Sequence, residues 1–284
     1  MSRFIISGFS DEISSDTTVQ FETLNRLGVK YFEPRGIDGK NISSLDDDGV
    51  LELKAKMEKY GILVSSIGSP IGKIQITDDF EKHLQLLKRV IKTAKMLDVK
   101  YIRIFSFFIP DGEYEKYRDE VIRRMKAMVA IAEEEGVILL HENEKEIYGD
   151  VASRCLEILE EVNSPNLRCV FDPANFVQCG QKTYPDAYEM LKPYIEYMHI
   201  KDALADGKVV PAGMGIGNVE EIITELYNDG YNGFLSLEPH LGNFMGFEKL
   251  EKRNEIRSVE KNLEEKYTLA YNALVKIIEK VEQV

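Results

Sequence analysis

Four residues with acid–base or metal-binding side chains stand at matching places in this sequence. Each lies at or near the end of a short apolar run, and the four are Glu142, Asp172, His199 and Glu238. They are roughly 27 to 39 residues apart, about the length of one strand–helix unit. Because parallel strands in a barrel end on the same face, three carboxylates and one imidazole can converge there on one divalent ion. The sequence therefore predicts a metal site built by four successive strands.

The segment 197–202 shows how one of these strands would present its side chains. Apolar and polar residues alternate along it, which is the period of a β-strand. The alternation places Tyr197, His199 and Lys201 on one face and Met198 and Ile200 on the other. A face that carries an imidazole and an ammonium group is unusual for a packed core. It suits a strand whose end lines a polar pocket.

Apolar stretches that predict strands alternate with amphipathic stretches that predict helices along the whole chain. The expected strands are 4–9, 30–35, 62–68, 101–107, 137–142, 168–172, 197–201 and 234–238. The expected helices are 16–27, 48–60, 79–97, 114–135, 150–162, 185–191 and 219–229, followed by helical material to about 281. Eight such units predict an α/β fold, a single-domain (β/α)8 TIM barrel over 1–284, with a C-terminal helical extension at about 247–284. The active site of such a barrel lies at the carboxyl ends of its strands.

Composition and charge exclude several classes of protein. The 284 residues include 36 Lys+Arg and 49 Asp+Glu, for a net charge of -13, which argues against binding a polyanion such as DNA. No apolar stretch approaches the roughly 20 residues that span a bilayer. The three cysteines show no C-x-x-C spacing, so neither a disulfide framework nor a thiolate metal site is indicated. We expect a soluble, reduced, cytoplasmic protein.

The proposed ligands are mostly oxygen atoms with a single imidazole, and this donor set favours Mn²⁺. Mg²⁺, Co²⁺ or Zn²⁺ are the alternatives. Lys201, and also Arg103 or Lys145, could balance the negative charge of three carboxylates around the ion. The simpler alternative is that each carboxylate pairs with a neighbouring Lys or Arg. Four suitable residues on four consecutive strands make that alternative less favoured.

The same strand ends carry a resemblance to a known family. The motifs are LLHENE at 139–144, FDPAN at 171–175, HIKDA at 199–203 and GFLSLEPH at 233–240. They resemble the second half of the xylose isomerase-like TIM barrels, a superfamily of sugar epimerases and inosose dehydratases. The resemblance implies that Glu142, Asp172, His199 and Glu238 bind a metal, and that the two glutamates also exchange protons with opposite faces of a sugar. Two departures are that Asn175 stands where epimerases commonly have a histidine, and that no arginine closely follows His199.

Residue chemistry and resemblance together predict a metal-dependent sugar isomerase or epimerase. A metal that holds a carbonyl and its neighbouring hydroxyl acidifies the C–H between them, and a carboxylate can then remove the proton. Return of the proton on the other face gives an epimer. The same enediolate can instead expel a β-leaving group, so a lyase or dehydratase acting on a keto-sugar, an inosose or a keto-glycoside is the alternative.

Seven residues near the expected strand ends are candidates for contact with a carbohydrate substrate. They are Asn175, Lys201, His240, Arg103, Arg35, Lys73 and Asn143. Arg35 could instead form a buried pair with Glu33, Lys73 could be merely solvated, and His240 could pack within its loop. Phe105 and Phe107 could form an aromatic wall, although core packing is favoured. His141 has the opposite parity to Glu142 and is expected to be structural.

Some features are expected to lie outside the site chemistry. His83 lies in a charged helical segment and is predicted to be a surface residue. The glycine-rich run 213–218 is predicted to be a mobile loop with Asn218 capping the next helix, because Glu220 and Glu221 in the first turn would repel a phosphate. The tail residues Leu263, Tyr267, Tyr271 and Leu274 have helical spacing and should pack on the barrel, with contact in a homo-oligomer as the alternative.

Two other functional classes remain on the sequence alone. An abasic-site endonuclease shares this barrel superfamily, but it needs several more histidine ligands than a chain with four His residues offers. A non-catalytic sugar-binding subunit would not need a complete ligand set. Both are less favoured than a metal-dependent enzyme.

Overall fold

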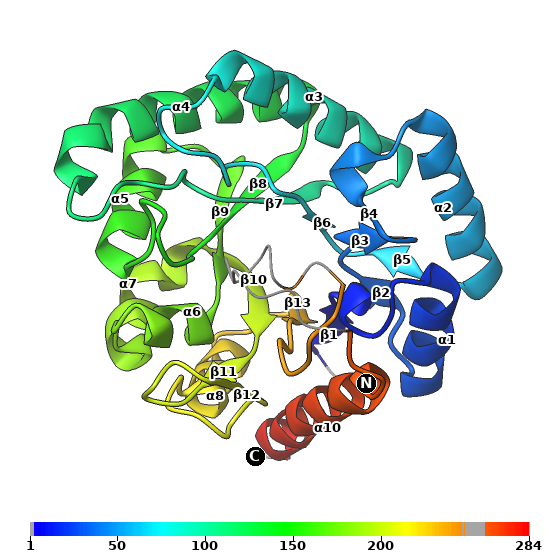
Figure 1. Ribbon diagram of the computed structural model, residues 1–284. Coiled ribbons are helices and arrows are strands. Elements are labelled where there is room, and N and C mark those ends of the chain that lie inside the picture. The colour runs from blue at the N-terminus through cyan, green and yellow to red at the C-terminus, as the bar shows by residue number, and fades with distance from the viewer. Residues whose placement is uncertain (1–2, 246, 248–258, 284) are drawn as a thin grey trace.

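The computed structural model describes residues 3–245, 247 and 259–283, and they form a closed ring of strands surrounded by helices (Figure 1). Seven parallel strands form one curled sheet in the order β1-β13-β10-β9-β8-β7-β6. These strands are β1 (Ile5–Gly8), β6 (Ile67–Gly68), β7 (Tyr101–Ile104), β8 (Ile138–Glu142), β9 (Leu167–Phe171), β10 (Ile195–Ile200) and β13 (Phe234–Leu237). The predicted TIM barrel is confirmed.

A short parallel pair, β2 (Tyr31–Phe32) with β5 (Leu63–Val64), fills the gap between the two edges of the sheet. On one side, the Glu33 amide donates to the Gly8 carbonyl of β1 at 2.9 Å. On the other side, the Gly68 amide of β6 donates to the Pro34 carbonyl, also at 2.9 Å. Residues 33–34 therefore close the barrel, although they lie outside any regular strand.

The helices form the outer ring in chain order (Figure 1). They are α1 (Thr17–Leu27), α2 (Asp47–Tyr60), α3 (Phe80–Met96), α4 (Tyr114–Glu135), α5 (Ala152–Val162), α6 (Pro173–Gln178), α7 (Tyr188–Leu191), α8 (Val219–Asn228) and α10 (Leu263–Glu282). Asp16 caps α1 and Asp46 caps α2, each accepting from a backbone amide two or three residues later. Gly28 and Gly61 end these helices at positive φ, which glycine adopts without steric cost.

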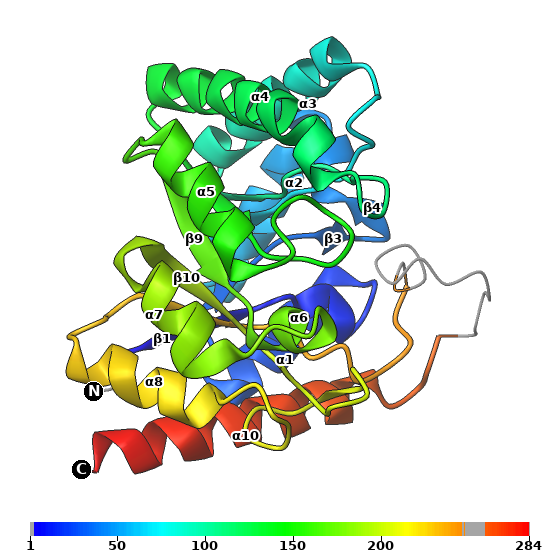
Figure 2. The same ribbon diagram turned by 90° about the vertical axis from the view of Figure 1, so that its left-hand side faces the viewer.

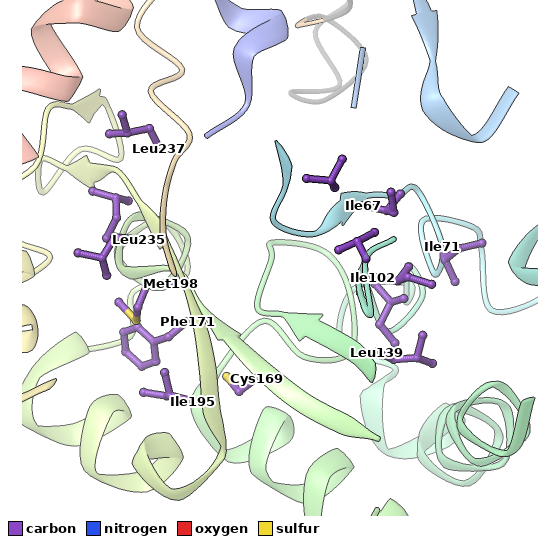
Figure 3. Close-up of a cluster of buried hydrophobic side chains, with 14 of the residues drawn as sticks. Ile67, Ile71, Ile102, Leu139, Cys169, Phe171, Ile195, Met198, Leu235 and Leu237 are labelled. Carbon is purple, nitrogen blue, oxygen red and sulfur yellow. The ribbon is translucent and has the colours of Figure 1, made fainter. Parts of the chain in front are cut away.

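Alternation along the strands separates two packed layers, as predicted for residues 197–201. Met198 and Ile200 of β10 face outward into the large core between sheet and helices, part of which is drawn in Figure 3. Tyr197 faces inward and packs with Leu140 and Val170 inside the barrel. The next inward positions on the same strands, two residues further along, are those of the predicted ligands. The barrel interior is thus apolar below and ionisable at its carboxyl end.

Several local elements differ from the sequence prediction. Strand β7 ends at Ile104 rather than continuing to residue 107, and Phe107 adopts a positive φ of 69°. Helix α6 begins directly after β9 and was not predicted. Two small hairpins also add to the carboxyl-end face, β3 (Gly36–Ile37) with β4 (Lys40–Asn41) and β11 (Asp202–Ala203) with β12 (Val209–Val210).

The prediction that His83 is a surface residue is wrong. The side chain lies on the inner face of α3 and is 5% exposed. Its Nε2 accepts a hydrogen bond from the Gly72 amide at 2.7 Å, and its ring lies beside Phe107. The charged residues next to His83 in the sequence indicated a solvent-exposed face of the helix. In the structure the loop 72–76 covers this turn of α3, and the Gly72 amide of that loop needs a hydrogen-bond acceptor. Burial, followed by the nearby Arg124, lowers the pKa of His83 to about 4.

This buried imidazole predicts a specific loss of stability in mild acid. The folded-state pKa of His83 lies below its unfolded value of about 6.5, so the unfolded chain gains a proton that the fold excludes. Stability should therefore be unaffected by His83 above pH 7 and should fall as the pH drops through 6 towards 4. Between pH 7 and 4.5 the wild type should lose about 1 to 2.5 kcal/mol more unfolding free energy than His83→Gln. Urea unfolding at both pH values measures this, and equal losses in the two proteins would contradict it.

The C-terminal helix α10 lies beside α8 and completes the ring between α8 and α1 (Figure 2). Its inner stripe includes Leu263, Tyr267 and Leu274, all buried, whereas Tyr271 is half-buried. The predicted extension begins at about 247, and its residues 248–258 lie outside the part of the chain that the structure describes. No helix in the described part of the chain combines enough length and apolar character to cross a membrane.

Candidate metal centre and active site

The four predicted ligands meet at the carboxyl end of the barrel. Glu142 ends β8, Asp172 follows β9, His199 lies near the end of β10 and Glu238 follows β13. One potential ligand atom from each lies within 4.8 Å of the others, and all four side chains are buried. The four strands are neighbours in the sheet, and each side chain occupies an inward-facing position at or next to the carboxyl end of its strand.

Asp172 is held in place by the start of helix α6. Its Oδ1 accepts from the Asn175 amide at 3.0 Å, which makes it the N-cap of the helix. Asn143, which directly follows β8, holds the backbone of Asp172: its Nδ2 donates to the Asp172 carbonyl at 3.0 Å, and its Oδ1 accepts from the Asp172 amide at 2.9 Å. The sequence signal for this helix is Pro173, because proline after an aspartate favours the first turn of a helix. Both polar atoms of the Asn143 side chain are therefore hydrogen-bonded to the backbone of Asp172.

Glu142 is surrounded by donors. Arg103 Nη1 donates to its Oε2 at 2.8 Å, and Asn175 Nδ2 donates to its Oε1 at 3.2 Å. His199 Nδ1 faces the same Oε1 at 3.0 Å. Asn175 Nδ2 also donates to the Asn143 carbonyl at 2.9 Å. This second hydrogen bond holds the Asn175 side chain in place against the Glu142 carboxylate. Arg103 and Asn175 thus contact a proposed ligand directly.

Glu238 has a second set of partners. Lys201 Nζ bridges its Oε2 and the Oδ2 of Asp172, the latter at 2.9 Å. Arg35 Nη1 donates to its Oε1 at 3.1 Å, and His240 Nε2 lies 3.4 Å from the same oxygen. Three of the predicted substrate contacts are therefore gathered around one carboxylate. They can orient it as well as meet a substrate.

The close carboxylates perturb one another's protonation. Burial, together with Glu142 and Glu238, raises the pKa of Asp172 to about 6 despite the attraction of Lys201. Burial opposes ionisation of Glu142 too, but His199 and Arg103 outweigh it and lower the pKa of that carboxyl. Burial disfavours a charged His199, but Glu142 and Glu33 raise its pKa to about 10. A buried group of three carboxylates and one imidazole, with ligand atoms this close together, fits a divalent metal ion.

Arg35 and Glu33 do not form the buried ion pair that the sequence analysis gave as an alternative. Arg35 binds Asp11 through Nε and Nη2 at 2.8 and 3.0 Å and reaches Glu12 at 3.2 Å. Its guanidinium lies over the rings of Phe9 and Phe244. Asp11 and Glu12 were not predicted to belong to the site, although they follow the first predicted strand closely. Every side-chain nitrogen of Arg35 faces a carboxylate, and the contact from Nη1 can hold Glu238 in its orientation.

The aromatic residues after β7 divide between site and core. Phe105 lies under two cations, with Lys73 Nζ 4.3 Å and the Arg103 guanidinium 4.5 Å from its ring centroid. Phe107 packs in the outer core against Phe80. Lys73 is not merely solvated, because it pairs with Glu144 at 3.1 Å and its side chain is 18% exposed. The Lys73 and Glu144 pair lies at the rim of the site.

The glycine-rich run is organised by Asp202. The carboxylate accepts from the backbone amides of Gly213, Gly215 and Gly217 at 3.1, 2.9 and 2.8 Å. An internal carboxylate therefore occupies the nest of amides that could otherwise bind phosphate. Asn218 occupies the N-cap position of α8 as predicted, with a φ of 55°. Its side chain, however, accepts from Thr183 Oγ1 and makes no capping hydrogen bond to the helix.

A cavity of about 450 Å³ adjoins the carboxylate cluster through His240. It lies between the β11–β12 hairpin and the segment after β13. Gln178 and Lys208 line one side, and Leu241 and Asn243 line the other. His240 is the lining residue that connects this cavity to Glu238.

Comparison with protein families decides where this arrangement belongs. Residues 21–264 match the model of the xylose isomerase-like TIM barrel. The chain belongs to the xylose isomerase-like TIM barrel family. The resemblance carried by the four motifs is therefore confirmed, and the match covers most of the barrel.

Two curated relatives catalyse different reactions. A 3-dehydroshikimate dehydratase from Bacillus anthracis is 25% identical over 184 residues, which cover 58% of this chain and 65% of that protein. A 2-epi-5-epi-valiolone 7-phosphate 2-epimerase from Actinoplanes sp. is 26% identical over 177 residues, which cover 62% of this chain and 64% of that protein. The chain thus spans just under two thirds of either relative. Relatives in this family include both epimerases and dehydratases.

Solved structures share the whole fold. The IolI protein with a bound zinc atom superposes with a TM-score of 0.75 at 18% identity, covering 99% of both chains. A xylose isomerase-like TIM barrel protein from Mycobacterium smegmatis in complex with magnesium has a TM-score of 0.68 at 18% identity, covering 98% of both chains. At such identity the likeness establishes the fold alone.

Proposed function

We propose that this protein is a divalent-metal-dependent carbohydrate isomerase or epimerase. The observation that carries the proposal is the meeting of Glu142, Asp172, His199 and Glu238 in one buried cluster at the carboxyl end of the barrel. These four would hold the ion, and the excess of oxygen donors favours Mn²⁺, with Mg²⁺, Co²⁺ and Zn²⁺ as alternatives. The bound ion would polarise a substrate carbonyl and acidify the neighbouring C–H.

The chain's own residues then supply the proton transfers. Glu142 and Glu238 come from strands on opposite flanks of β9 and β10 and each keeps a cationic partner, Arg103 and Lys201 respectively. A carboxylate held ionised in this way can take a proton from the carbon next to a carbonyl and leave an enediolate. The second carboxyl group returns a proton to the other face. Asn175 and Arg35 keep the two carboxylates aimed while the charge moves.

Elimination is the second candidate, and Lys201 is the residue that favours it. Its ammonium group is buried and lies between Asp172 and Glu238, where it can give a proton to a departing hydroxyl group. A dehydratase among the relatives agrees with this chemistry. The two reactions share the first step, the loss of a proton beside a carbonyl.

Proton exchange tests that shared step without knowledge of the product. The metal-loaded protein is incubated in D₂O with ketohexoses, an inosose, a keto-glycoside and 3-dehydroshikimate, and the mixtures are followed by NMR. We expect deuterium to replace the proton on the carbon next to the carbonyl of at least one substrate, and chelation to stop the exchange. An epimer identifies the first candidate, whereas an unsaturated product identifies the second.

The same experiment can reject the proposal. Absence of exchange across the panel, with one equivalent of Mn²⁺ bound to the protein, would leave a metal-binding barrel without this activity. Exchange that is unchanged by chelation would remove the metal from the reaction.

A further inference from the structure

Glu33 is a buried carboxylate that the proposed chemistry leaves without a role. It follows β2 at the closure of the barrel, is 1% exposed, and has its backbone amide tied to Gly8. Its Oε2 accepts from Tyr197 Oη at 3.0 Å and from Ser236 Oγ at 2.8 Å, and lies 3.2 Å from His199 Nε2. Three groups from β10 and β13 thus converge on one oxygen from the far side of the barrel.

The two nitrogens of His199 face different partners. Nε2 points to Glu33, whereas Nδ1 points to the cluster, 3.0 Å from Glu142 and 3.7 Å from Glu238. The Phe9 ring lies edge-on at 5.1 Å between ring centroids and limits rotation of the imidazole. In the neutral imidazole that a metal ligand requires, a hydrogen on Nε2 that is donated to Glu33 leaves the Nδ1 lone pair directed at the cluster.

We propose that Glu33 is the positioning residue for the imidazole ligand, fixing the Nε2–H tautomer of His199 so that Nδ1 is the metal-binding atom. A carboxylate that accepts from the distal nitrogen also makes the ligand nitrogen more basic and holds the ring plane. This inference rests on the proposed metal site. It assigns a function to a residue that is distant in sequence from every proposed ligand and reaches the cluster through His199.

The decisive measurement is metal affinity, because a purely structural role of Glu33 would not change it selectively. In calorimetric titrations with Mn²⁺, Glu33→Gln should raise the Kd about tenfold and Glu33→Ala up to about a hundredfold. Tyr197→Phe and Ser236→Ala are matched controls, since each removes another donor to the same oxygen but keeps the Glu33 to His199 contact. Both controls should bind Mn²⁺ within about twofold of the wild type. Circular dichroism establishes that each variant is folded.

A second readout reports the tautomer itself. Long-range ¹H–¹⁵N spectra of the Mg²⁺-loaded wild type should show His199 protonated on Nε2, and Glu33→Ala should lose that pattern. Wild-type Kd in Glu33→Gln, or equal weakening in Glu33→Gln and Tyr197→Phe, would overturn the positioning role while leaving the metal site intact. A wild type that binds no Mn²⁺ would instead overturn the proposed function and this inference together. If Glu33→Ala does not fold, the Kd of Glu33→Gln alone tests the positioning role.

Discussion

Glu142→Gln and Glu238→Gln should each lower the rate of substrate proton exchange by about 10²–10⁴-fold while the barrel stays folded. The neutral amide of glutamine has nearly the same shape as the carboxylate but cannot accept a proton at neutral pH. The measurement is deuterium incorporation in D₂O at saturating Mn²⁺, so that weaker metal binding does not enter the rate. Glu144→Gln is the matched control, because Glu144 pairs with Lys73 at the rim and should leave exchange within about threefold.

The two variants should also differ in what they retain. If one glutamate takes the proton and the other returns it, one variant should still exchange slowly without forming an epimer. Full activity in either variant would remove that residue from the acid–base pair. Equal loss in Glu144→Gln would place the reacting proton at the rim instead.

His199→Ala should lose metal and activity together. It removes the only nitrogen donor among the four proposed ligands, and the remaining three carboxylates have only their side-chain cations to balance them. We expect the Kd for Mn²⁺ to rise by at least about a hundredfold, with partial recovery of exchange at millimolar Mn²⁺. Metal analysis of protein purified without chelator, before and after reloading, measures the loss directly.

The matched control for this variant is another buried histidine. His141 lies on β8 next to Glu142 but faces the opposite side of the sheet, where its ring packs on Gly149. His141→Ala should therefore lower thermal stability and keep about one equivalent of metal. A reloaded wild type that holds less than about a tenth of an equivalent would contradict the metal site and leave a salt-bridged barrel mouth.

The sequence by itself determined the barrel and the level of the barrel at which the four proposed ligands lie. Strand period two and helix period 3.6 are local properties, so the residues themselves show which side chains face inward. In 197–201 the alternation separated His199 from Met198 and Ile200, and the structure confirms it. The spacing of Glu142, Asp172, His199 and Glu238 predicted their convergence for the same reason, because each strand–helix unit of the barrel repeats the same geometry.

Only the tertiary structure decided which charges meet across the barrel. Arg35 faces Asp11 and Glu238 rather than Glu33, although Glu33 is only two residues away in the sequence. His83 is buried because a loop that is separated from it in sequence needs an acceptor. Such pairings depend on the curvature of the closed sheet and on loop paths, which no periodicity encodes. Burial makes them energetically decisive, since an ionisable or polar group that is cut off from water must find its partner wherever the chain places one.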